Sequence, residues 1–284
     1  MNVADVLATV ASTLEVHGIP DHRLEAELLV GYALGLDRAR LYAALNDAVP
    51  DKRLQALDEL VALRVERRPL AYLLGHREFY SLDFLVSPAV MVPRPETETL
   101  VDRALQWAQA RGGRPLVVAD VGTGSGAIAV TIALRLPSAR VLAIDVSREA
   151  LSVAGVNAQR HGVADRIALV AGDLLSAVTG PLDMVLANLP YIPDADLDDL
   201  QEEVRVYEPR IALAGGPDGL NLIRRLLAQA TKVMRPGGLL LLEISPVQRE
   251  AVLQEATGAF PGAQIELVRD LGGWERVLEV RLSP

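Results

Sequence analysis

From about residue 115 to its end, the chain alternates short apolar runs with longer helical patterns, and this constrains the fold more than any other feature. The runs typical of strands are RPLVVAD, ARVLAID, RIALVAG, LDMVLAN, PGGLLLLEI, AQIELVRD and WERVLEVRL. Helical patterns such as GSGAIAVTIALRLP and SREALSVAGVNAQRHG separate several of them, and Ser147 is expected to cap the second. This order predicts an α/β fold with a mostly parallel, doubly wound sheet, whose ligands bind at the carboxyl ends of the strands.

The first 75 residues differ, because their apolar residues recur only at helical spacing. Those of the opening segment are Val3, Val6, Leu7, Val10 and Leu14. Further helical segments follow, and we expect Asp51 to cap one of them and Pro69 to end it. The expected domains are a helical bundle over residues 1–75, a β-hairpin linker over 76–95 and the α/β domain over 96–284.

Composition narrows the possible functions. The chain has no cysteine, which excludes disulfides and thiolate metal sites, and its four histidines show no ligand spacing, so no metal is expected. The N-terminus lacks the basic region of a signal peptide, and no apolar run approaches the ~18 residues of a membrane helix. We therefore expect a cytoplasmic protein with no membrane partner. A net charge of −9 and 4% aromatic residues argue against nucleic acid as a partner.

The first strand of the α/β part ends in the glycine-rich stretch VGTGSGA. Gly122, Gly124 and Gly126 let the backbone pass close to a ligand, and the following helix presents unpaired N–H groups. Asp145, at the end of the next strand, is where a ribose-binding carboxylate belongs. Because Gly122, Gly124 and Ala127 also fit the dinucleotide pattern, this turn predicts nucleotide binding and leaves the nucleotide open.

The next two strand ends narrow that choice. Asp173, in AGDLL, is placed to accept a hydrogen bond from an adenine amino group, and Asn188 begins the tetrad NLPY. A planar NH₂ group is a poor nucleophile, because its lone pair is delocalised into the neighbouring π system. Acceptors aimed at both N–H bonds, here the Asn188 side-chain oxygen and the Leu189 carbonyl, favour the pyramidal nitrogen of a methyl-transfer transition state. Pro190 restrains the local backbone, and Tyr191 offers a ring face to a flat substrate.

The chain resembles the bacterial protein-(glutamine-N5) methyltransferases that act on peptide chain release factors. The resemblance covers essentially the whole chain and rests on VPRPETE (Val92–Glu98), DVGTGSG, AIDVS, NLPYIP, EPRIALAGGPDGL and RDLGGWERVL. It implies an S-adenosylmethionine-dependent methyltransferase domain with seven strands, the last antiparallel, preceded by a five-helix domain and a hairpin linker. The implied substrate is the glutamine of the Gly-Gly-Gln motif in class 1 release factors, and the implied by-product is S-adenosyl-L-homocysteine. We also expect a monomer.

The resemblance assigns roles to individual residues. The methionine part of the cofactor falls to Gly122, Thr123, Gly124, Ser125 and Gly126, the ribose to Asp145, and the adenine region to Asp173 and Leu174. The substrate amide falls to Asn188, Leu189, Pro190 and Tyr191, with Asn188 also next to the cofactor. The linker residues expected to close over the reaction centre are Met91, Arg94, Glu96 and Thr97. The chain departs from the family pattern at two positions. Leu189 stands where Asn-Pro-Pro-Tyr is usual, and Glu243, Ile244 and Ser245 stand where the family tends to have Glu-Ile-Gly. Glu243 is expected to be buried with a structural hydrogen-bonding role.

Three alternatives stay open. NLPY is the usual form in ribosomal-RNA adenine dimethyltransferases, so an RNA or DNA adenine N6 group remains a possible acceptor, as does a glutamine of another ribosome-associated protein. A nucleotide-binding module without catalysis is the third. Two observations argue against RNA. The RNA enzymes tend to follow the tyrosine with Asn, whereas this tetrad continues with Ile192-Pro193, and residues 193–209 contain seven acids and a single basic residue, Arg205. Such a segment repels phosphates and suits a basic protein partner, although a solvated helix face has the same charge pattern.

Overall fold

The computed structural model describes residues 1–284 and divides them into two compact units. One unit comprises residues 1–75 together with 201–207, and the other comprises residues 76–200 and 208–284. None of the helices is long and apolar enough to cross a membrane.

The helical unit is built on five helices near the N-terminus: α1 (Val3–Val16), α2 (His22–Leu34), α3 (Arg38–Ala43), α4 (Asp51–Val65) and α5 (Leu70–Leu74). Their apolar stripes meet in a core that includes Val6, Leu14, Leu29, Leu41 and Leu57. The helical spacing of the first segment is therefore confirmed as a buried face.

Two details at the ends of α4 correct the expectations from the sequence. Pro50, not Asp51, occupies the N-cap position, and Asp51 lies in the first turn, where the helix dipole favours its negative charge. Pro69 does not end α4, which stops at Val65; instead Pro69 precedes the first residue of α5. Its missing N–H costs nothing at the start of a helix, where such groups have no intrahelical partner.

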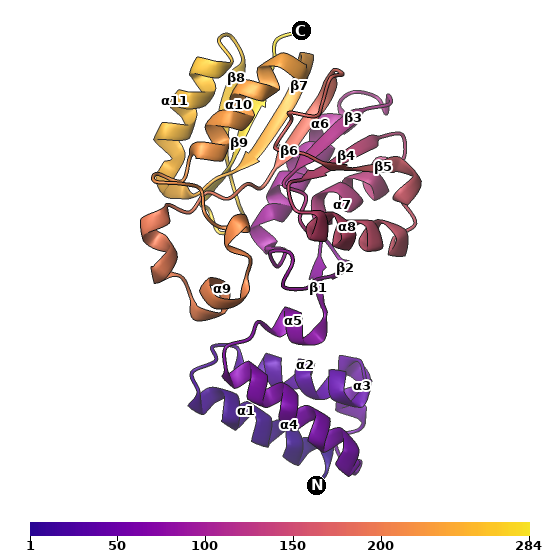
Figure 1. Cartoon of the computed structure of the whole chain (residues 1–284). Helices are drawn as coiled ribbons and strands as arrows, with labels where there is room; N and C mark the ends of the chain where they lie inside the picture. Colours follow the sequence, from indigo (N-terminus) through magenta and orange to yellow (C-terminus); the bar gives the residue numbers. More distant parts are fainter. The chain divides into compact units, whose positions relative to one another are not determined.

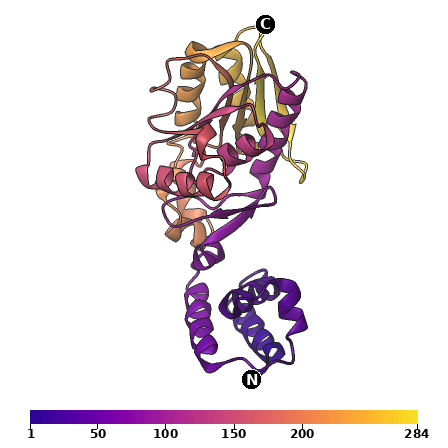
Figure 2. The same ribbon diagram turned by 90° about the vertical axis from the view of Figure 1, so that its right-hand side faces the viewer.

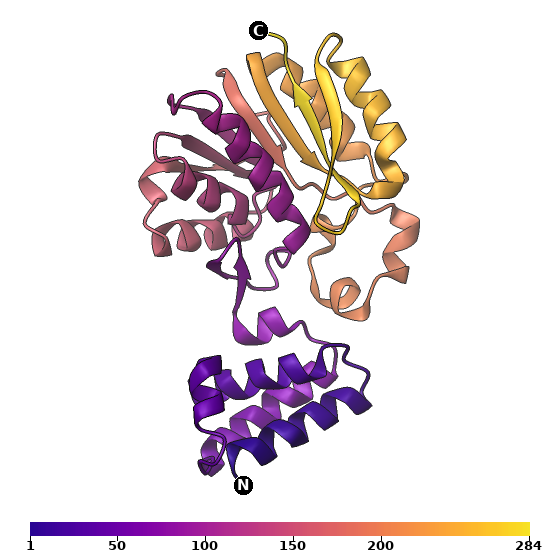
Figure 3. The same cartoon turned by 180° about the vertical axis from the view of Figure 1, so that it is seen from behind.

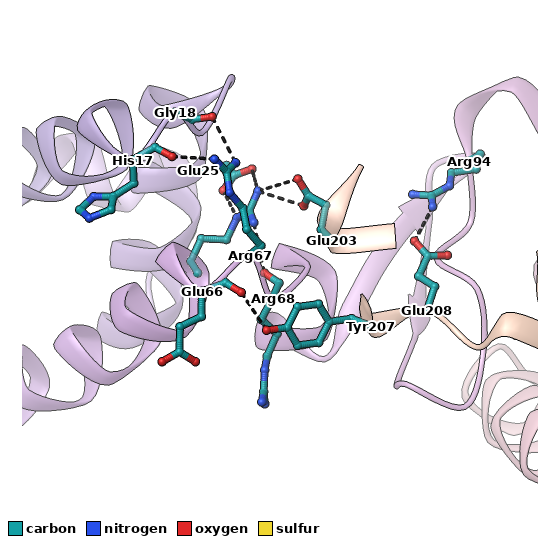
Figure 4. Close-up of polar contacts among 11 residues, drawn as sticks. His17, Gly18, Glu25, Glu66, Arg67, Arg68, Arg94, Glu203, Tyr207 and Glu208 are labelled. Atoms are coloured by element: carbon teal, nitrogen blue, oxygen red, sulfur yellow. Dashed lines mark hydrogen bonds and ion pairs between the residues drawn. The ribbon is translucent and has the colours of Figure 1, made fainter. Parts of the chain in front are cut away.

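Residues 201–207 belong to the helical unit although they are distant from it in sequence. Arg64 is 1% exposed, and its Nε donates to Glu25 Oε2 at 2.6 Å. Its Nη2 pairs with Glu203 Oε2 at 3.0 Å, and the hydroxyl of Tyr207 donates to the carbonyl of Glu66 at 2.8 Å (Figure 4). These contacts hold helix α9 (Glu202–Tyr207) against the unit.

The α/β unit contains a seven-stranded sheet. Its strands are β3 (Val117–Val121), β4 (Arg140–Asp145), β5 (Ile167–Ala171), β6 (Leu182–Ala187), β7 (Met234–Glu243), β8 (Gln264–Arg269) and β9 (Glu275–Arg281). They lie in the order β5-β4-β3-β6-β7-β9-β8, and β9 is antiparallel to both of its neighbours. The doubly wound, mostly parallel sheet predicted from the alternation is confirmed, and so are the seven strands with an antiparallel last strand that the resemblance implied.

Helices cover both faces of this sheet. They are α6 (Glu98–Gln109), α7 (Ala127–Arg135), α8 (Arg148–Arg160), α10 (Asn221–Val233) and α11 (Arg249–Ala259). Buried residues of α6 and α7 share one apolar cluster, and those of α10 and α11 share the other. Figures 1 and 3 show α10 and α11 on one face and α6 on the opposite face, and Figure 2 shows the strands between them. Ser147 caps α8 as expected, because its Oγ accepts from the Ala150 N–H at 3.1 Å.

A β-hairpin precedes the sheet, with β1 (His76–Phe79) paired antiparallel to β2 (Leu82–Leu85). Tyr80 and Ser81 form its two-residue turn, and both have positive φ, as turns that match the strand twist require. Asn157 of α8 holds the hairpin to the sheet domain, since its side chain accepts from the Leu85 N–H at 2.8 Å and donates to the Leu85 carbonyl at 2.9 Å.

Candidate active site

A cavity of about 370 Å³ lies at the carboxyl ends of the central strands. Strands β3 and β6 are neighbours, yet the chain runs from β3 toward β4 and β5 before it returns to β6. This is the switch point at which open α/β sheets bind their ligands. The cavity is large enough for a small-molecule cofactor. Its walls come entirely from the α/β unit.

The glycine-rich turn after β3 forms one wall, lined by Gly122, Thr123, Gly124 and Ser125. Gly122 and Gly124 have φ of +75° and +54°, a conformation that side chains disfavour. Gly126 does not line the cavity. It has φ +79°, and a Cβ there would lie 3.1 Å from the Ala154 Cβ, so this glycine allows α7 and α8 to approach each other.

A buried acid underlies the turn. Asp120 is completely buried, and its Oδ2 accepts from the Thr123 hydroxyl at 2.6 Å and from the Ala129 N–H at 3.0 Å. Burial raises the pKa of Asp120 to about 7. This acid is not among the residues expected from the sequence, where its only signal is that it interrupts an apolar strand.

Asp145, at the end of β4, joins the turn to the next helix. Its Oδ2 accepts from the Gly124 N–H and its Oδ1 from the Ser147 N–H, each at 2.9 Å. Asp145 lines the cavity, and each carboxylate oxygen keeps a further lone pair for a ligand hydroxyl. The carboxylate is therefore oriented in advance.

Asp173 and Leu174, after β5, also line the cavity. Asp173 is exposed and pairs with Arg225 of α10. Leu174 is buried with φ +54°, a backbone conformation that a leucine rarely adopts. The ion pair and the unusual turn fix the loop beside the cavity.

Three residues of the tetrad after β6 line the same cavity: Asn188, Leu189 and Pro190. The Nδ2 of Asn188 donates to the hydroxyl oxygen of Thr97 at 3.1 Å. The Leu189 side chain is 3% exposed, and its Cδ2 lies 3.1 Å from the position that a Cβ on Gly122 would take. The sheet thus brings the tetrad directly against the glycine turn.

Tyr191 does not line the cavity. Its hydroxyl lies 3.4 Å from Glu243 Oε1, to which it donates. Burial, followed by the nearby Glu243 charge, raises the pKa of Tyr191, so the phenol stays protonated.

The linker after the hairpin contributes Met91, Arg94 and Thr97 to the cavity wall. Glu96, which was expected with them, is exposed and lies outside the wall. Arg94 forms an ion pair with the buried carboxylate of Glu208 (Figure 4). The Oε2 of Glu208 also accepts from the Val92 N–H at 3.4 Å. Glu208 thereby holds the linker in place.

The acidic segment is therefore less uniform than its sequence suggests. Glu203 pairs with Arg64 in the helical unit, and Glu208 is buried against the linker. The acids that remain exposed are Asp194, Asp196, Asp198, Asp199 and Glu202.

Several apolar wall residues are absent from the expected site. They are Phe79, Ala89, Val90, Pro209, Ile211 and Ala212. The last three belong to EPRIAL, whose apolar residues carry no chemical signal of their own. Only the folding of η4 (Arg210–Ala212) beside the cavity reveals their position.

Known proteins resemble the chain over nearly its full length. A family model described as the PrmC N-terminal domain matches residues 5–75, and one described as the methyltransferase small domain matches residues 104–205. The release factor glutamine methyltransferase of Moorella thermoacetica is 44% identical over 279 residues, which cover 97% of each chain. This chain belongs to the release factor glutamine methyltransferase family. The member from Geobacter sulfurreducens is 42% identical over 252 residues, covering 88% of this chain and 87% of its own.

Membership confirms the expected S-adenosylmethionine-dependent protein glutamine methyltransferase and does not favour a nucleic-acid amino group as the acceptor. The solved structure of a ribosomal protein L11 methylase from Lactobacillus delbrueckii subsp. bulgaricus has a TM-score of 0.52 and 25% identity, covering 70% of this chain and 84% of that one. A methyltransferase from Pyrococcus furiosus has the same TM-score at 18% identity and covers 72% of this chain and 91% of its own, which supports the fold.

Proposed function

We propose that the protein methylates the side-chain amide nitrogen (N5) of the glutamine in the Gly-Gly-Gln motif of class 1 peptide chain release factors. The names of relatives that match most of the chain support this substrate. The observation that most directly supports the proposed reaction is the position of Asn188. It lies in the cavity wall next to the glycine turn, with its NH₂ group turned toward Thr97.

The cavity suits S-adenosylmethionine, which supplies an electrophilic methyl group when bound. Gly122 and Gly124 leave space that side chains would fill, and the oriented carboxylate of Asp145 can accept from the ribose hydroxyls. We assign the methionine part to the glycine turn and the adenine region to Asp173 and Leu174, which line the same cavity. Gly126 supports this site through the packing of α7.

For the substrate, we assign the two amide N–H bonds to the Asn188 Oδ1 and the Leu189 carbonyl. These acceptors orient the nitrogen and favour its pyramidal form in the transition state. The nitrogen gains the methyl carbon as the methyl–sulfur bond breaks, and it then loses one proton to water, so no strong base is needed. Pro190 restrains this backbone. Tyr191 does not line the cavity, so we assign it to the substrate amide as a ring that supports the tetrad through its contact with Glu243.

The remaining assignments are further parts of the proposal. Met91, Arg94 and Thr97 cover the substrate side of the cavity, and we assign Glu96, which is exposed outside the cavity wall, to the rim of the same cover. Residues 1–75 recognise the release factor, 76–95 act as a linker, and 96–284 carry the methyltransferase site. The protein works as a cytoplasmic monomer without a nucleic-acid partner, in keeping with its net charge of −9.

Incubation with S-adenosylmethionine and a purified release factor tests this function. Mass spectrometry should find one added methyl group on the glutamine of the Gly-Gly-Gln peptide, and none when that glutamine is replaced by asparagine. An unmodified glutamine together with methyl-adenine in ribosomal RNA would contradict the proposal.

A further inference from the structure

A line of three hydrogen-bonding side chains runs from the end of β7 to the cavity. The hydroxyl of Thr97 donates to Glu243 Oε2 at 2.6 Å, and the Nδ2 of Asn188 donates to the same hydroxyl oxygen at 3.1 Å. Glu243 and Thr97 are 2% and 5% exposed, so water does not compete for these bonds. The other oxygen of Glu243 accepts from the Tyr191 hydroxyl at 3.4 Å. One carboxylate is thus linked to both ends of the tetrad.

The direction of these bonds determines which atom Asn188 presents to the cavity. An ionised carboxylate only accepts hydrogen bonds, so it takes the single proton of the Thr97 hydroxyl. The hydroxyl oxygen can then only accept from Asn188, which must turn its NH₂ group toward Thr97. The Oδ1 of Asn188 is left to accept from a ligand.

We propose that Glu243 and Thr97 are positioning residues that set the orientation of the Asn188 amide, so that its Oδ1 faces the N–H of the substrate glutamine. The inference rests on the proposed function. It extends the site to a strand end that none of the assigned substrate or cofactor contacts includes.

The charge of Glu243 controls this orientation. Burial raises the pKa of Glu243 to about 7, opposed by the Thr97 hydrogen bond and by the charge of Arg276 on β9. Glu96 raises the same pKa, and the hydrogen bond from Tyr191 lowers it. Arg276 is itself paired with Asp270 at 3.3 Å.

Protonation of Glu243 allows the hydrogen bonds between Glu243, Thr97 and Asn188 to reverse their direction. Below about pH 7 a protonated Glu243 can donate to Thr97, whose own proton then turns toward Asn188. In that arrangement Asn188 accepts with its Oδ1 and presents NH₂ to the cavity, where it opposes the substrate N–H. We therefore expect turnover to fall as the pH falls through about 7, and this acid limb to disappear in Glu243→Gln, which has no proton to gain.

Replacement of Thr97 tests the orientation directly. Thr97→Val keeps the shape and removes the hydroxyl, so turnover should fall roughly 10- to 100-fold, less than the ~10²–10³-fold that removal of a group contacting the transition state costs. Thr97→Ser should recover most of this loss. Thr131→Val is the matched control, because Thr131 is also buried and its hydroxyl bonds only the Ala127 carbonyl at 2.7 Å in α7. The affinity for S-adenosylmethionine, measured by calorimetry, should stay within about threefold of the wild type in all three variants. Retained cofactor binding also shows that each variant is folded.

A measurement without substrate separates this inference from the proposed function. The side-chain amide NMR signals of Asn188, assigned through Asn188→Ala, should shift with pH at the pKa of Glu243 in the wild type and not in Thr97→Val. If the wild type fails to methylate a release factor but these signals titrate, the substrate assignment fails and the orientation stands. A Thr97→Val variant with wild-type turnover would overturn the positioning role. Asn188 signals that ignore pH would overturn the control of this orientation by the charge of Glu243.

Discussion

Leu189 packs directly against Gly122, with its Cδ2 3.1 Å from the position that a Cβ on that glycine would occupy. This relationship joins the turn assigned to the cofactor to the tetrad assigned to the substrate. The leucine at the second tetrad position keeps its backbone carbonyl, and its side chain fills space beside the turn. The spacing between the glycine turn and the tetrad therefore depends on the packing of one apolar side chain.

Replacement of Gly122 by alanine should weaken cofactor binding by at least about tenfold. An alanine at this position would have to adopt a positive φ, which costs about 1 kcal/mol. Its Cβ would also crowd the Leu189 side chain. Gly162→Ala is the matched control, because Gly162 has φ +67° but nothing within 4 Å of a new Cβ. Calorimetric titration with S-adenosylmethionine measures the effect. Equal cofactor affinities for the two variants would show that the contact with Leu189 is unimportant.

Asn188→Ala should lower turnover by roughly 10²–10³-fold, because one of two acceptors for the substrate amide is lost. Cofactor affinity should change far less, since the glycine turn and Asp145 remain intact. Single-turnover kinetics with a release factor, paired with cofactor titration, separates the two effects. Near-normal turnover would contradict the assigned role of the Asn188 side chain.

Arg64→Met should destabilise the protein by roughly 3 kcal/mol, because the partly buried carboxylates of Glu25 and Glu203 would lose their shared, buried partner. Protease cleavage within residues 201–207 should also become faster, since Glu203 helps to hold α9. Arg40→Ala is the control, as its ion pair with Asp37 is exposed and should contribute less than about 1 kcal/mol. Urea denaturation measures both variants. An unchanged cleavage rate in Arg64→Met would show that this arginine does not anchor α9.

Asp120→Asn should change how stability depends on pH. The pKa of Asp120 is raised from 3.8 to about 7, so between these values the folded state holds a proton that the unfolded state has lost. The raised pKa therefore adds up to about 4 kcal/mol to the free energy of unfolding. This contribution is fully present below pH 4 and is lost as the pH rises to 7. The asparagine variant lacks it, so its stability relative to the wild type should rise between pH 4.5 and 8. A relative stability that stays constant over this range in urea titrations would exclude the raised pKa.

Much of the fold followed from local patterns. The alternation of strands and helices can be predicted because apolar runs and 3.6-residue periodicity involve only residues that are close in sequence. The parallel strands then bring Gly122, Asp145 and Asn188 to one edge of the sheet. The cap at Ser147 is equally local. The cap assigned to Asp51 was wrong by one position, because the chain enters α4 through Pro50 and the boundary depends on backbone angles.

The sequence by itself determined the class of sheet, the site at its carboxyl edge and the residue types that suit an amide methyl transfer. Only the tertiary structure decided how these residues are held. Thr97 and Glu243 are separated by 146 positions, and Arg64 and Glu203 by 139, so no local pattern indicates either contact. Burial makes the difference: it turns acids that look solvated in the sequence into fixed, hydrogen-bonded groups, because a carboxylate removed from water must find its partners within the fold.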